Sequence, residues 1–432
     1  MRTLYRLLIL LLLPALALRL WWKGLGNKGY RERWRERFGH YAPEPPGSRL
    51  RSPLWIHAVS VGEVAAAVPL IKALRQALPE VDLLITTTTP TGRDAVTRQF
   101  GQALRHFYFP YDASFIVCRF LAHFRPRALI ILETELWPNL LAHCAAQGIP
   151  AYLVNGRLSM NSANRYALLR PLVAPMLSQF AGIAMQTRED ADRLRGLGAP
   201  PARLHVTGSL KYDVHVPASL FEEAASLRRD LGPDRPVWIA ASTRVGEEVQ
   251  VLAAFASVAK ALPRALLVLA PRHPERFGGV EELCLKAGLG VHRRTAGPLG
   301  ERRVEVFLLD TMGELMKFYA AADVAFVGGS LLPFGGQNML EPAALGVPVV
   351  TGPSLYNFAA IAERLADAGA LRVAATAAEV ATYVVAWLSD SEQRDAAGRA
   401  GKASIAANRG ATQRTLAVLQ PLFDRTDASR VA

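Results

Sequence analysis

Residues 323–350 read DVAFVGGSLLPFGGQNMLEPAALGVPVV. Apolar runs typical of strands stand at both ends, and between them a glycine-rich turn leads into a helix expected to open on Asn338. Asn338 and Glu341 are spaced as a capping box, which satisfies the free amides of a helix's first turn. The same layout suits a nucleotide, because glycines let amides approach a phosphate and a carboxylate can bind ribose hydroxyls. This stretch alone leaves both interpretations open.

The alternation of strands and helices extends over most of the chain. In the first half, strands are predicted at 53–59, 81–89 and 127–133, and the pattern restarts at 236–243 and 265–271. Such alternation indicates parallel sheets with helices on both faces. We therefore expect an α/β protein of two Rossmann-like, doubly wound domains with a ligand cleft between them.

Proline-rich and charged segments divide the chain further. A proline-rich spacer precedes the first strand, a charged helical stretch separates the two halves, and the tail after Asp424 is expected to be frayed. The expected segments are a membrane anchor (1–22), a basic membrane-proximal segment (23–50), a first Rossmann-like domain (51–212), a linker (213–235) and a second Rossmann-like domain (236–432).

The formal charge of +13 is concentrated near the N-terminus, where the residues up to Arg51 include eleven Lys and Arg but three Glu. No recognisable nucleic-acid reader accompanies these cations, so nucleic acid is not the expected partner. An anionic membrane surface explains their position better. A hydrophobic content of 51% excludes general disorder.

The N-terminal segment predicts membrane attachment. Leu7 to Leu18 is an unbroken apolar run between Arg6 and Arg19, and Trp21 and Trp22 follow as in an interfacial aromatic belt. The run is shorter than the roughly 20 residues that span a bilayer, although the flanking arginines could snorkel. Spanning and lying in the interface both stay open. A cleaved signal peptide is the alternative, and the bulky residues after the run disfavour it. The excess of cations after the run predicts that the body is cytoplasmic.

The cysteines carry no evident chemistry. Cys118, Cys144 and Cys284 lie far apart without metal-ligand spacing, so neither a disulfide framework nor a zinc site is expected. Each is expected to be a small buried apolar residue in a reducing compartment.

Polar residues that directly follow predicted strands of the first half are candidate site residues. Ser60, Gly62 and Glu63 stand in the first strand-to-helix turn, which lacks GxGxxG and so does not indicate a dinucleotide. Glu63 could be a general base or merely an acid stabilised by the helix dipole. Glu133 and Glu135 follow a buried strand and need basic or ligand partners at that depth.

Further candidates follow later strands. Arg157 and Lys211 could bind anionic groups of a sugar or lipid, or pair with the glutamates. In the second half, three strand-end loops could meet at one nucleotide, with Arg272 as the phosphate partner and a helix N-terminus as a source of amide donors without a metal. These loops carry Arg272 and His273, then Met312, Gly313 and Glu314, then Asn338 and Glu341.

Nine motifs, taken together, resemble those of one enzyme family. HAVSVGE, TPTG, ETELWPNL, NGRLS, GSLKYD, PRHPERF, DTMGEL, FVGGSL and GGQNMLEP occur here in the order of the 3-deoxy-D-manno-octulosonic acid (Kdo) transferases, bacterial inner-membrane enzymes of lipopolysaccharide synthesis. The resemblance extends from the N-terminal anchor to about residue 420. Gln337 departs from it, because family members often have histidine there.

The resemblance implies a GT-B glycosyltransferase fold at the cytoplasmic face of the inner membrane. It implies that the first domain takes a lipid A precursor, that the second holds the donor CMP-Kdo, and that no metal or other cofactor is needed. Glu63 matches the proposed proton acceptor and Glu133 a second carboxylate important for activity. The implied CMP contacts are Pro271, Arg272, Met312, Gly313, Glu314, Asn338, Met339, Leu340 and Glu341.

The implied chemistry is direct displacement with inversion. A carboxylate removes the proton of a sugar hydroxyl as that hydroxyl attacks the anomeric carbon, while cations and amides stabilise the departing CMP phosphate. Two alternatives stay open at this point, a GT-B transferase that uses a UDP-sugar and a non-catalytic membrane-bound scaffold. The number of Kdo units transferred, the acylation of the acceptor and the oligomeric state are also open.

Overall fold

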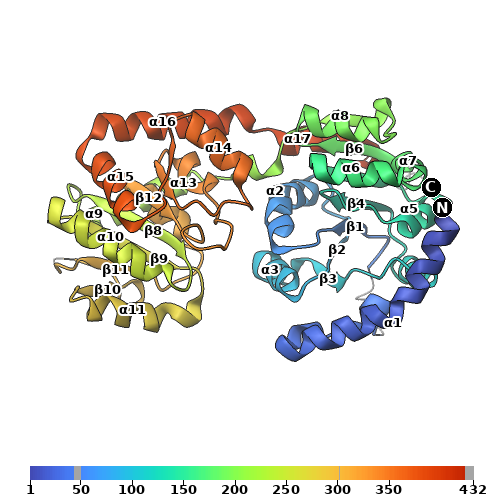
Figure 1. The fold of residues 1–432 in the computed structure, drawn as a ribbon, viewed down its shortest axis with the longest axis horizontal. Coiled ribbons are helices and arrows are strands. Elements are labelled where there is room, and N and C mark those ends of the chain that lie inside the picture. The colour runs from blue at the N-terminus through green and yellow to red at the C-terminus, as the bar shows by residue number, and fades with distance from the viewer. Residues whose placement is uncertain (43–49, 301, 424–432) are drawn as a thin grey trace. The chain divides into compact units, whose positions relative to one another are not determined.

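The computed structural model describes residues 1–42, 50–300 and 302–423 (Figure 1). These residues form two compact units, with boundaries at Asp213/Val214 and at Asn408/Arg409, so that the end of the chain belongs to the first unit. Residues 43–49 of the expected basic segment and spacer, and the tail after Asp424, lie outside the described residues.

Unit 1 is built on a sheet of seven parallel strands in the order β3-β2-β1-β4-β5-β6-β7. Ile56 of β1 is paired with Ile85 on one side and Ile130 on the other, and all three are buried because helices cover both faces. The strands are β1 (Leu54–His57), β2 (Leu83–Thr87), β3 (Arg105–Tyr108), β4 (Ala128–Leu132), β5 (Ala151–Gly156), β6 (Phe180–Met185) and β7 (Leu204–Val206).

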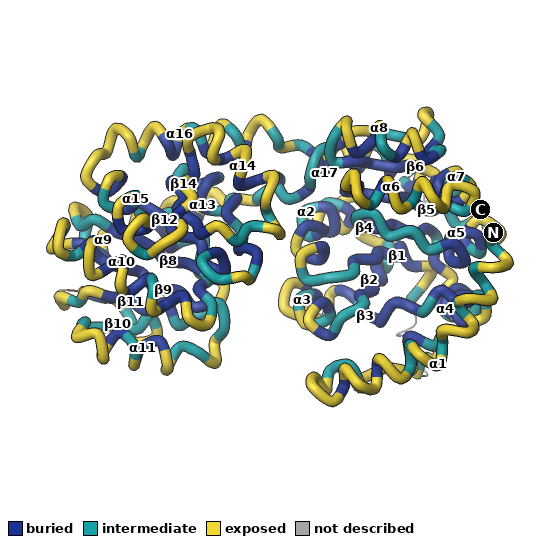
Figure 2. The backbone as a smooth tube through the Cα atoms, viewed as in Figure 1, coloured by how far each residue is buried: buried dark blue, intermediate teal, exposed yellow. Residues whose placement is uncertain are grey.

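Helices pack on both faces of this sheet, with their buried residues toward the sheet and their exposed residues outward (Figure 2). They are α2 (Val61–Ala77), α3 (Pro90–Phe100), α4 (Ser114–Phe124), α5 (Pro138–Ala146), α6 (Met160–Leu168), α7 (Arg170–Leu177), α8 (Arg188–Gly196) and α17 (Ala411–Val418). Short 3-10 turns join them at η1 (Lys28–Tyr30), η2 (Trp34–Phe38), η3 (Gly101–Ala103), η4 (Pro201–Arg203) and η5 (Leu210–Tyr212).

Helix α17 returns from the end of the chain to the core of unit 1. Ala411 and Leu419 are fully buried there, and the Asp213 carboxylate accepts hydrogen bonds from the backbone nitrogens of Gly410 (2.7 Å) and Thr412 (2.5 Å). The sequence pattern assigned everything from 236 onward to the second domain, because an amphipathic helix shows that one face is buried but not against which core.

Unit 2 repeats the architecture, with seven parallel strands in the order β10-β11-β9-β8-β12-β13-β14. They are β8 (Val237–Thr243), β9 (Leu266–Pro271), β10 (Val291–Arg293), β11 (Val306–Leu308), β12 (Val324–Val327), β13 (Val349–Thr351) and β14 (Leu371–Val373). The described parts of both units therefore confirm the predicted doubly wound parallel sheets.

The helices of unit 2 include one from the segment expected to be a linker. Leu220 and Leu227 of α9 (Ser219–Leu231) are buried in this unit's core. The others are α10 (Glu247–Ala261), α11 (Phe277–Lys286), α12 (Leu315–Ala321), α13 (Leu340–Leu345), α14 (Ala359–Asp367), α15 (Ala377–Ser389) and α16 (Ser391–Asn408), with 3-10 turns η6 (Pro274–Arg276) and η7 (Arg294–Ala296).

The N-terminal apolar run forms one helix of 25 residues, α1 (Arg2–Gly26), which is long and apolar enough to cross a membrane by length and composition. Its first turns are attached to unit 1, because the Tyr5 hydroxyl donates to Asp112 Oδ2 (2.9 Å) and Arg6 Nε donates to Asn139 Oδ1 (3.3 Å). Most of its leucines, together with Trp21 and Trp22, are exposed (Figure 2). An apolar surface of this kind is typical of a membrane-contacting helix.

Candidate active site

The three candidate glutamates of unit 1 lie at the switch point of its sheet. Strand β1 pairs with β2 on one side and with β4 on the other, so the loops that follow β1 and β4 diverge from neighbouring strand ends. Open α/β sheets bind ligands at such a point. Glu63 follows β1, and Glu133 and Glu135 follow β4.

Glu63 is folded back over the start of helix α2. Ser60 is the N-cap, and its hydroxyl donates to Glu63 Oε1 (3.1 Å). Glu63 Oε2 accepts the backbone N–H of Val59 at 2.7 Å. Ser60 and Glu63 therefore cap the start of α2 together, an arrangement that was not predicted for this turn, and Glu63 is 9% exposed. Gly62 stands beside it in the exposed part of this turn.

The surroundings of Glu63 change its acidity. The pKa of Glu63 is raised to about 7, chiefly by burial and also by the negative charges of Glu133 and Glu135, against hydrogen bonds from Val59 and Ser60 that lower it. Burial and the Glu133 charge also raise the pKa of Glu135. The three carboxyl groups thus interact at one edge of the sheet. A carboxyl group with a pKa near neutrality is suited to accept a proton at physiological pH.

The chain is strained where β4 and β5 end. Glu133 and Asn155 have left-handed backbone angles, with φ of 56° and 54°. Residues other than glycine rarely adopt this conformation, and such residues are concentrated at functional sites. Asn155 Oδ1 accepts the backbone N–H of Leu210 at 3.0 Å, which joins the NGRLS and GSLKYD loops. Asn155 was not predicted as a site residue.

A second link joins the loops after β4 and β5. The Thr134 hydroxyl donates to the backbone oxygen of Arg157, and the Arg157 backbone N–H donates to Thr134 Oγ1 at 3.2 Å. The Arg157 side chain is exposed, whereas Lys211 is half-buried. The structure therefore brings the ETEL, NGRLS and GSLKYD loops to the same edge as Glu63.

His57, in the HAVSVGE motif, lies beneath this edge. It is fully buried and stacks on Phe109 with ring centroids 3.8 Å apart. Burial lowers the pKa of His57 to about 3, so its ring is neutral at physiological pH. His57 therefore packs beneath the strand end as a neutral ring.

In unit 2 the glycine-rich loop after β12 is held by a carboxylate from another helix. Glu247 Oε1 accepts the backbone N–H groups of Ser330 (2.8 Å) and Leu331 (2.9 Å), and Oε2 accepts those of Gly329 (2.6 Å) and Arg244 (2.9 Å). Glu247 is fully buried. The three loop amides are therefore occupied by a protein carboxylate, and the loop does not offer them to a phosphate. Sequence reasoning missed Glu247.

Gly328 is required by close packing. A Cβ atom there would lie 2.8 Å from the Cα of Thr243 on the neighbouring strand β8. No side chain fits at that separation, so the glycine brings the ends of β8 and β12 together.

The prediction of a capping box with Asn338 as the N-cap is wrong, because the helix begins later in the chain. Helix α13 begins at Leu340 with Met339 as its N-cap, so Glu341 is in the second helical position instead of the third. Asn338 Oδ1 accepts the backbone N–H of Leu340 (3.1 Å), and Asn338 Nδ2 donates to Glu341 Oε1 (3.0 Å). The two side chains still interact, so Asn338 fixes the orientation of the Glu341 carboxylate.

Arg272 and Glu341 influence each other electrostatically. Burial raises the pKa of Glu341, while the bond from Asn338 and the charge of Arg272 lower it. The backbone N–H of Arg272 donates to Thr243 O at 3.0 Å. Pro271, Met339 and Leu340 are buried.

The DTMGEL loop leads into helix α12. Met312 is 50% exposed, Gly313 has a φ of 93°, and Glu314 is the N-cap. Glu314 is paired with Arg294 (2.9 Å), and this partner lowers the pKa of Glu314. The Glu314 carboxylate is therefore occupied by Arg294.

His273 contacts an arginine that the sequence did not single out. Arg244 Nη1 lies 2.8 Å from His273 Nε2, and the Arg244 guanidinium lies 4.8 Å from the centroid of the Phe334 ring. Arg244 stands in the strand-to-helix turn after β8, as Ser60 stands in the turn after β1. The similar sequences of these two turns, SVGE and TRVGEE, were the signal that could have identified Arg244 as a candidate site residue.

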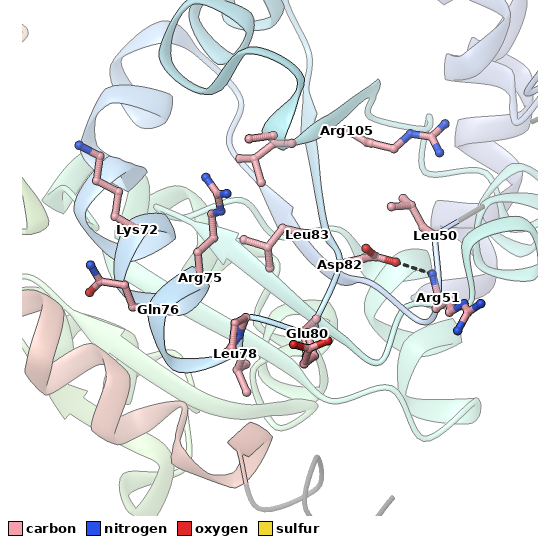
Figure 3. Close-up of a pocket in the computed structure, with 14 residues that line it drawn as sticks. Leu50, Arg51, Lys72, Arg75, Gln76, Leu78, Glu80, Asp82, Leu83 and Arg105 are labelled. Carbon is pink, nitrogen blue, oxygen red and sulfur yellow. Dashed lines mark hydrogen bonds between the residues drawn. The ribbon is translucent and has the colours of Figure 1, made fainter. Parts of the chain in front are cut away.

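A pocket of about 900 Å³ lies at the opposite edge of the unit 1 sheet, where strands β2 and β3 begin (Figure 3). Its lining includes Lys72, Arg75 and Arg105, and Asp82 accepts the backbone N–H of Arg51 at 2.7 Å. None of the candidate residues lines this pocket. Among the described residues, no group of three or more His, Cys, Asp or Glu side chains is arranged to hold a metal ion.

Comparison with known proteins identifies the family. Residues 32–214 match the family model described as 3-deoxy-D-manno-octulosonic-acid transferase (kdotransferase). The chain is 41% identical to the 3-deoxy-D-manno-octulosonic acid transferase of Haemophilus influenzae, with 92% of each chain covered. It is 40% identical to that of Bordetella pertussis, covering 89% of this chain and 90% of the relative.

Two solved structures are also similar. The C-terminal CMP-Kdo binding domain of an Acinetobacter baumannii protein is 37% identical and matches 43% of this chain and 98% of its own, with a TM-score of 0.41. UDP-GlcNAc 2-epimerase from Neisseria meningitidis is 14% identical over 85% of this chain and 100% of its own, with a TM-score of 0.55, a likeness of fold alone.

The two doubly wound units place the protein in the GT-B fold class, with candidate site residues beyond the carboxyl ends of the strands of each sheet. A fold does not determine the reaction of an enzyme, but sequence identity of about 40% over about nine tenths of the chain establishes the family here. The chain belongs to the family of 3-deoxy-D-manno-octulosonic acid (Kdo) transferases, which are glycosyltransferases.

Proposed function

We propose that this protein transfers Kdo from CMP-Kdo to a sugar hydroxyl of a lipid A precursor, lipid IVA, with inversion at the anomeric carbon and with Glu63 as general base. The observation that carries the proposal is the buried Glu63 carboxyl at the switch point of unit 1, whose pKa of about 7 fits a proton acceptor.

The proposed reaction forms one bond and breaks another. The acceptor oxygen bonds to the anomeric carbon, the bond from that carbon to the CMP phosphate oxygen breaks, and the acceptor proton moves to Glu63. Glu133 is proposed as the second carboxylate of the site, where developing positive charge on the sugar would be stabilised. Ser60 and Gly62 shape this turn, and Glu135, Arg157 and Lys211 are candidate contacts to the acceptor.

The donor is proposed to bind at the strand ends of unit 2. Arg272 faces the phosphate, and Asn338 and Glu341 face the ribose, because an oriented carboxylate can accept two hydroxyl hydrogen bonds. The backbones of Pro271, Met312–Glu314, Met339 and Leu340 complete the CMP site. Because Arg272 supplies positive charge at the leaving group, we propose that transfer needs no metal ion.

The acceptor is proposed to reach unit 1 from the membrane. Helix α1 exposes leucines and two tryptophans, and the basic residues that follow suit an anionic inner-membrane surface at its cytoplasmic face. The contacts of Tyr5 and Arg6 with unit 1 hold the start of α1 against the body of the protein. They favour a helix that lies in the interface over one that leaves the body to span the bilayer.

Two measurements test the proposal on the full chain in detergent. CMP is expected to raise the unfolding temperature and UDP to leave it unchanged, because a ligand stabilises only the state that binds it. Mass spectrometry is expected to show Kdo added to lipid IVA from CMP-Kdo, also in the presence of EDTA. Protection by UDP alone would favour a UDP-sugar transferase. Absence of any transfer would favour the non-catalytic scaffold.

A further inference from the structure

Arg244 occupies the switch point of the unit 2 sheet, in the loop between β8 and α10. Its guanidinium contacts the neutral partner His273 (2.8 Å) and the ring of Phe334 (4.8 Å). Within the described residues no carboxylate lies at ion-pair distance from this guanidinium. A half-buried cation without an anionic partner is costly, so it commonly marks a site that an anionic ligand completes.

Several other arginines of unit 2 differ in this respect. Five of them form ion pairs with carboxylates, namely Arg228 with Asp323 (3.0 Å), Arg276 with Glu248, Arg293 with Glu281 (2.5 Å), Arg294 with Glu314 (2.9 Å) and Arg394 with Asp395 (3.2 Å). The charges of these five arginines are balanced inside the protein. Arg244 instead keeps its full charge for a group that comes from outside.

The side chain of Arg244 is oriented by its neighbours. Burial and the charge of Arg244 lower the pKa of His273, so the imidazole is neutral and its Nε2 accepts the hydrogen bond from Arg244. The guanidinium also lies over the ring of Phe334, which restricts it further. An arginine fixed in this way loses little freedom when it binds a carboxylate with both ends of its fork.

The backbone of Arg244 is fixed as well. Glu247 Oε2 accepts the N–H groups of Arg244 (2.9 Å) and Gly329 (2.6 Å), so one oxygen joins the loop after β8 to the loop after β12. Ser242 turns the strand end with a left-handed φ of 56°. Arg244 therefore stands on a rigid base beside the loops of the proposed donor site.

The chemistry of the donor calls for a second cation. Kdo is a 2-ulosonic acid, so its anomeric carbon carries a carboxylate as well as the phosphate ester of the activated donor. The Arg272 side chain can bind the phosphate. The backbone N–H of Arg272 donates to the backbone oxygen of Thr243, the residue next to Arg244. We propose that Arg244 binds the sugar carboxylate of the donor and so selects an acidic sugar over neutral ones. This inference rests on the proposed function.

The test separates the two halves of the donor. For the wild type, Arg244→Met, Arg244→Lys and the control Arg229→Met on the exposed face of α9, CMP affinity is measured by calorimetry and transfer by steady-state kinetics. CMP lacks the sugar carboxylate, so Arg244→Met is expected to bind it within about twofold of wild type, while KM for CMP-Kdo rises at least about tenfold. Arg244→Lys recovers part of this loss, because it restores the charge without the fork.

The outcomes are distinguishable. Equal losses for CMP and CMP-Kdo would overturn the inference, because Arg244 would then serve the loop or the phosphate. Unchanged kinetics in Arg244→Met beside an active wild type would also overturn it and leave the proposed function intact. A wild-type protein that binds CMP but transfers no Kdo would overturn the proposed function and, with it, this inference.

Discussion

The Glu63 carboxylate lies 2.7 Å from the backbone nitrogen of Val59, so the proposed general base is also tied to the end of strand β1. Its other oxygen receives the hydroxyl of Ser60 at 3.1 Å. Each carboxylate oxygen has a second lone pair, so helix capping and proton transfer do not exclude each other. The helix cap instead holds the base in position, and position governs the efficiency of proton transfer.

Replacing Glu63 by Gln is expected to lower kcat by a factor of about 10² to 10⁴, because the amide cannot accept the proton. The Gln oxygen can still accept from Val59, so below about pH 4.5, where the wild-type carboxyl group is protonated as well, the free energy of unfolding should change by less than about 1 kcal/mol. Transfer kinetics and urea unfolding measure the two effects. The same substitution at the exposed Glu80 is the control. Retention of more than a tenth of the activity would rule out the assignment.

The raised pKa of Glu63 predicts a pH dependence. Transfer, measured as kcat/KM, should fall as the pH drops through about 7, because protonated Glu63 cannot act as a base. Glu133→Gln removes one of the charges that raise this pKa, so the acidic limb of its remaining activity should move to lower pH. If the acidic limb of the pH profile of Glu133→Gln lies at the same pH as in the wild type, the Glu133 charge does not raise the pKa of Glu63.

The same group links pH to stability. Its folded pKa of about 7 exceeds the ordinary value of 4.5, so the folded state binds the proton more tightly than the unfolded state does. The stabilisation that this proton binding gives the folded state is fully present below about pH 4.5, and it is lost as the pH rises to about 7. The slope of the unfolding free energy across this range should be more positive in Glu63→Gln than in the wild type.

Removing the Glu247 carboxylate should destabilise unit 2. Glu247→Ala leaves four backbone N–H groups without their acceptor, and each buried unsatisfied donor costs about 1–3 kcal/mol. We expect a loss of at least about 3 kcal/mol in urea unfolding, and a smaller loss in Glu247→Gln, which keeps one oxygen. Glu392→Ala on exposed α16 is the control. A loss below about 1 kcal/mol would show that water replaces the carboxylate.

The contact between Tyr5 and Asp112 should hold α1 on unit 1. Asp112 also accepts the backbone N–H groups of Asn139 (3.0 Å) and Leu140 (2.7 Å) at the start of α5, so Tyr5 completes a buried network. Tyr5→Phe should cost about 1 kcal/mol in urea unfolding and speed proteolysis within α1. Tyr356→Phe, at an exposed tyrosine, should do neither.

Charges on the exposed face of α1 should abolish membrane binding. Leu7 and Leu11 are 61% and 78% exposed, and glutamates there would have to enter the apolar part of the interface. The double change Leu7→Glu, Leu11→Glu should remove the protein from floated anionic vesicles. Leu285→Glu, at a 57% exposed leucine of unit 2, should float like the wild type. Equal flotation of both variants would exclude α1 as the membrane contact.

The sequence predicted what depends on local pattern. Runs of buried residues located the strands, and the meeting of parallel strand ends at one edge brought Glu63 together with Glu133 and Glu135. Glu247 was beyond reach, because its hydrogen-bond partner Gly329 is 82 residues away along the chain and a glutamate at a helix start has an adequate local explanation. The start of α13 was misplaced because Asn338 suits positions before the N-cap as well as the N-cap itself.

The return of α17 to unit 1 has a consequence for biosynthesis. Ala411, Leu419 and Leu422 complete a core that begins with residues of β1, and they are translated after the whole of unit 2. Unit 2 is continuous from Val214 to Asn408 and can close its own core before these residues are made. The unit translated first is therefore the one that matures last, and until then it presents an unfilled apolar surface to chaperones and to the membrane.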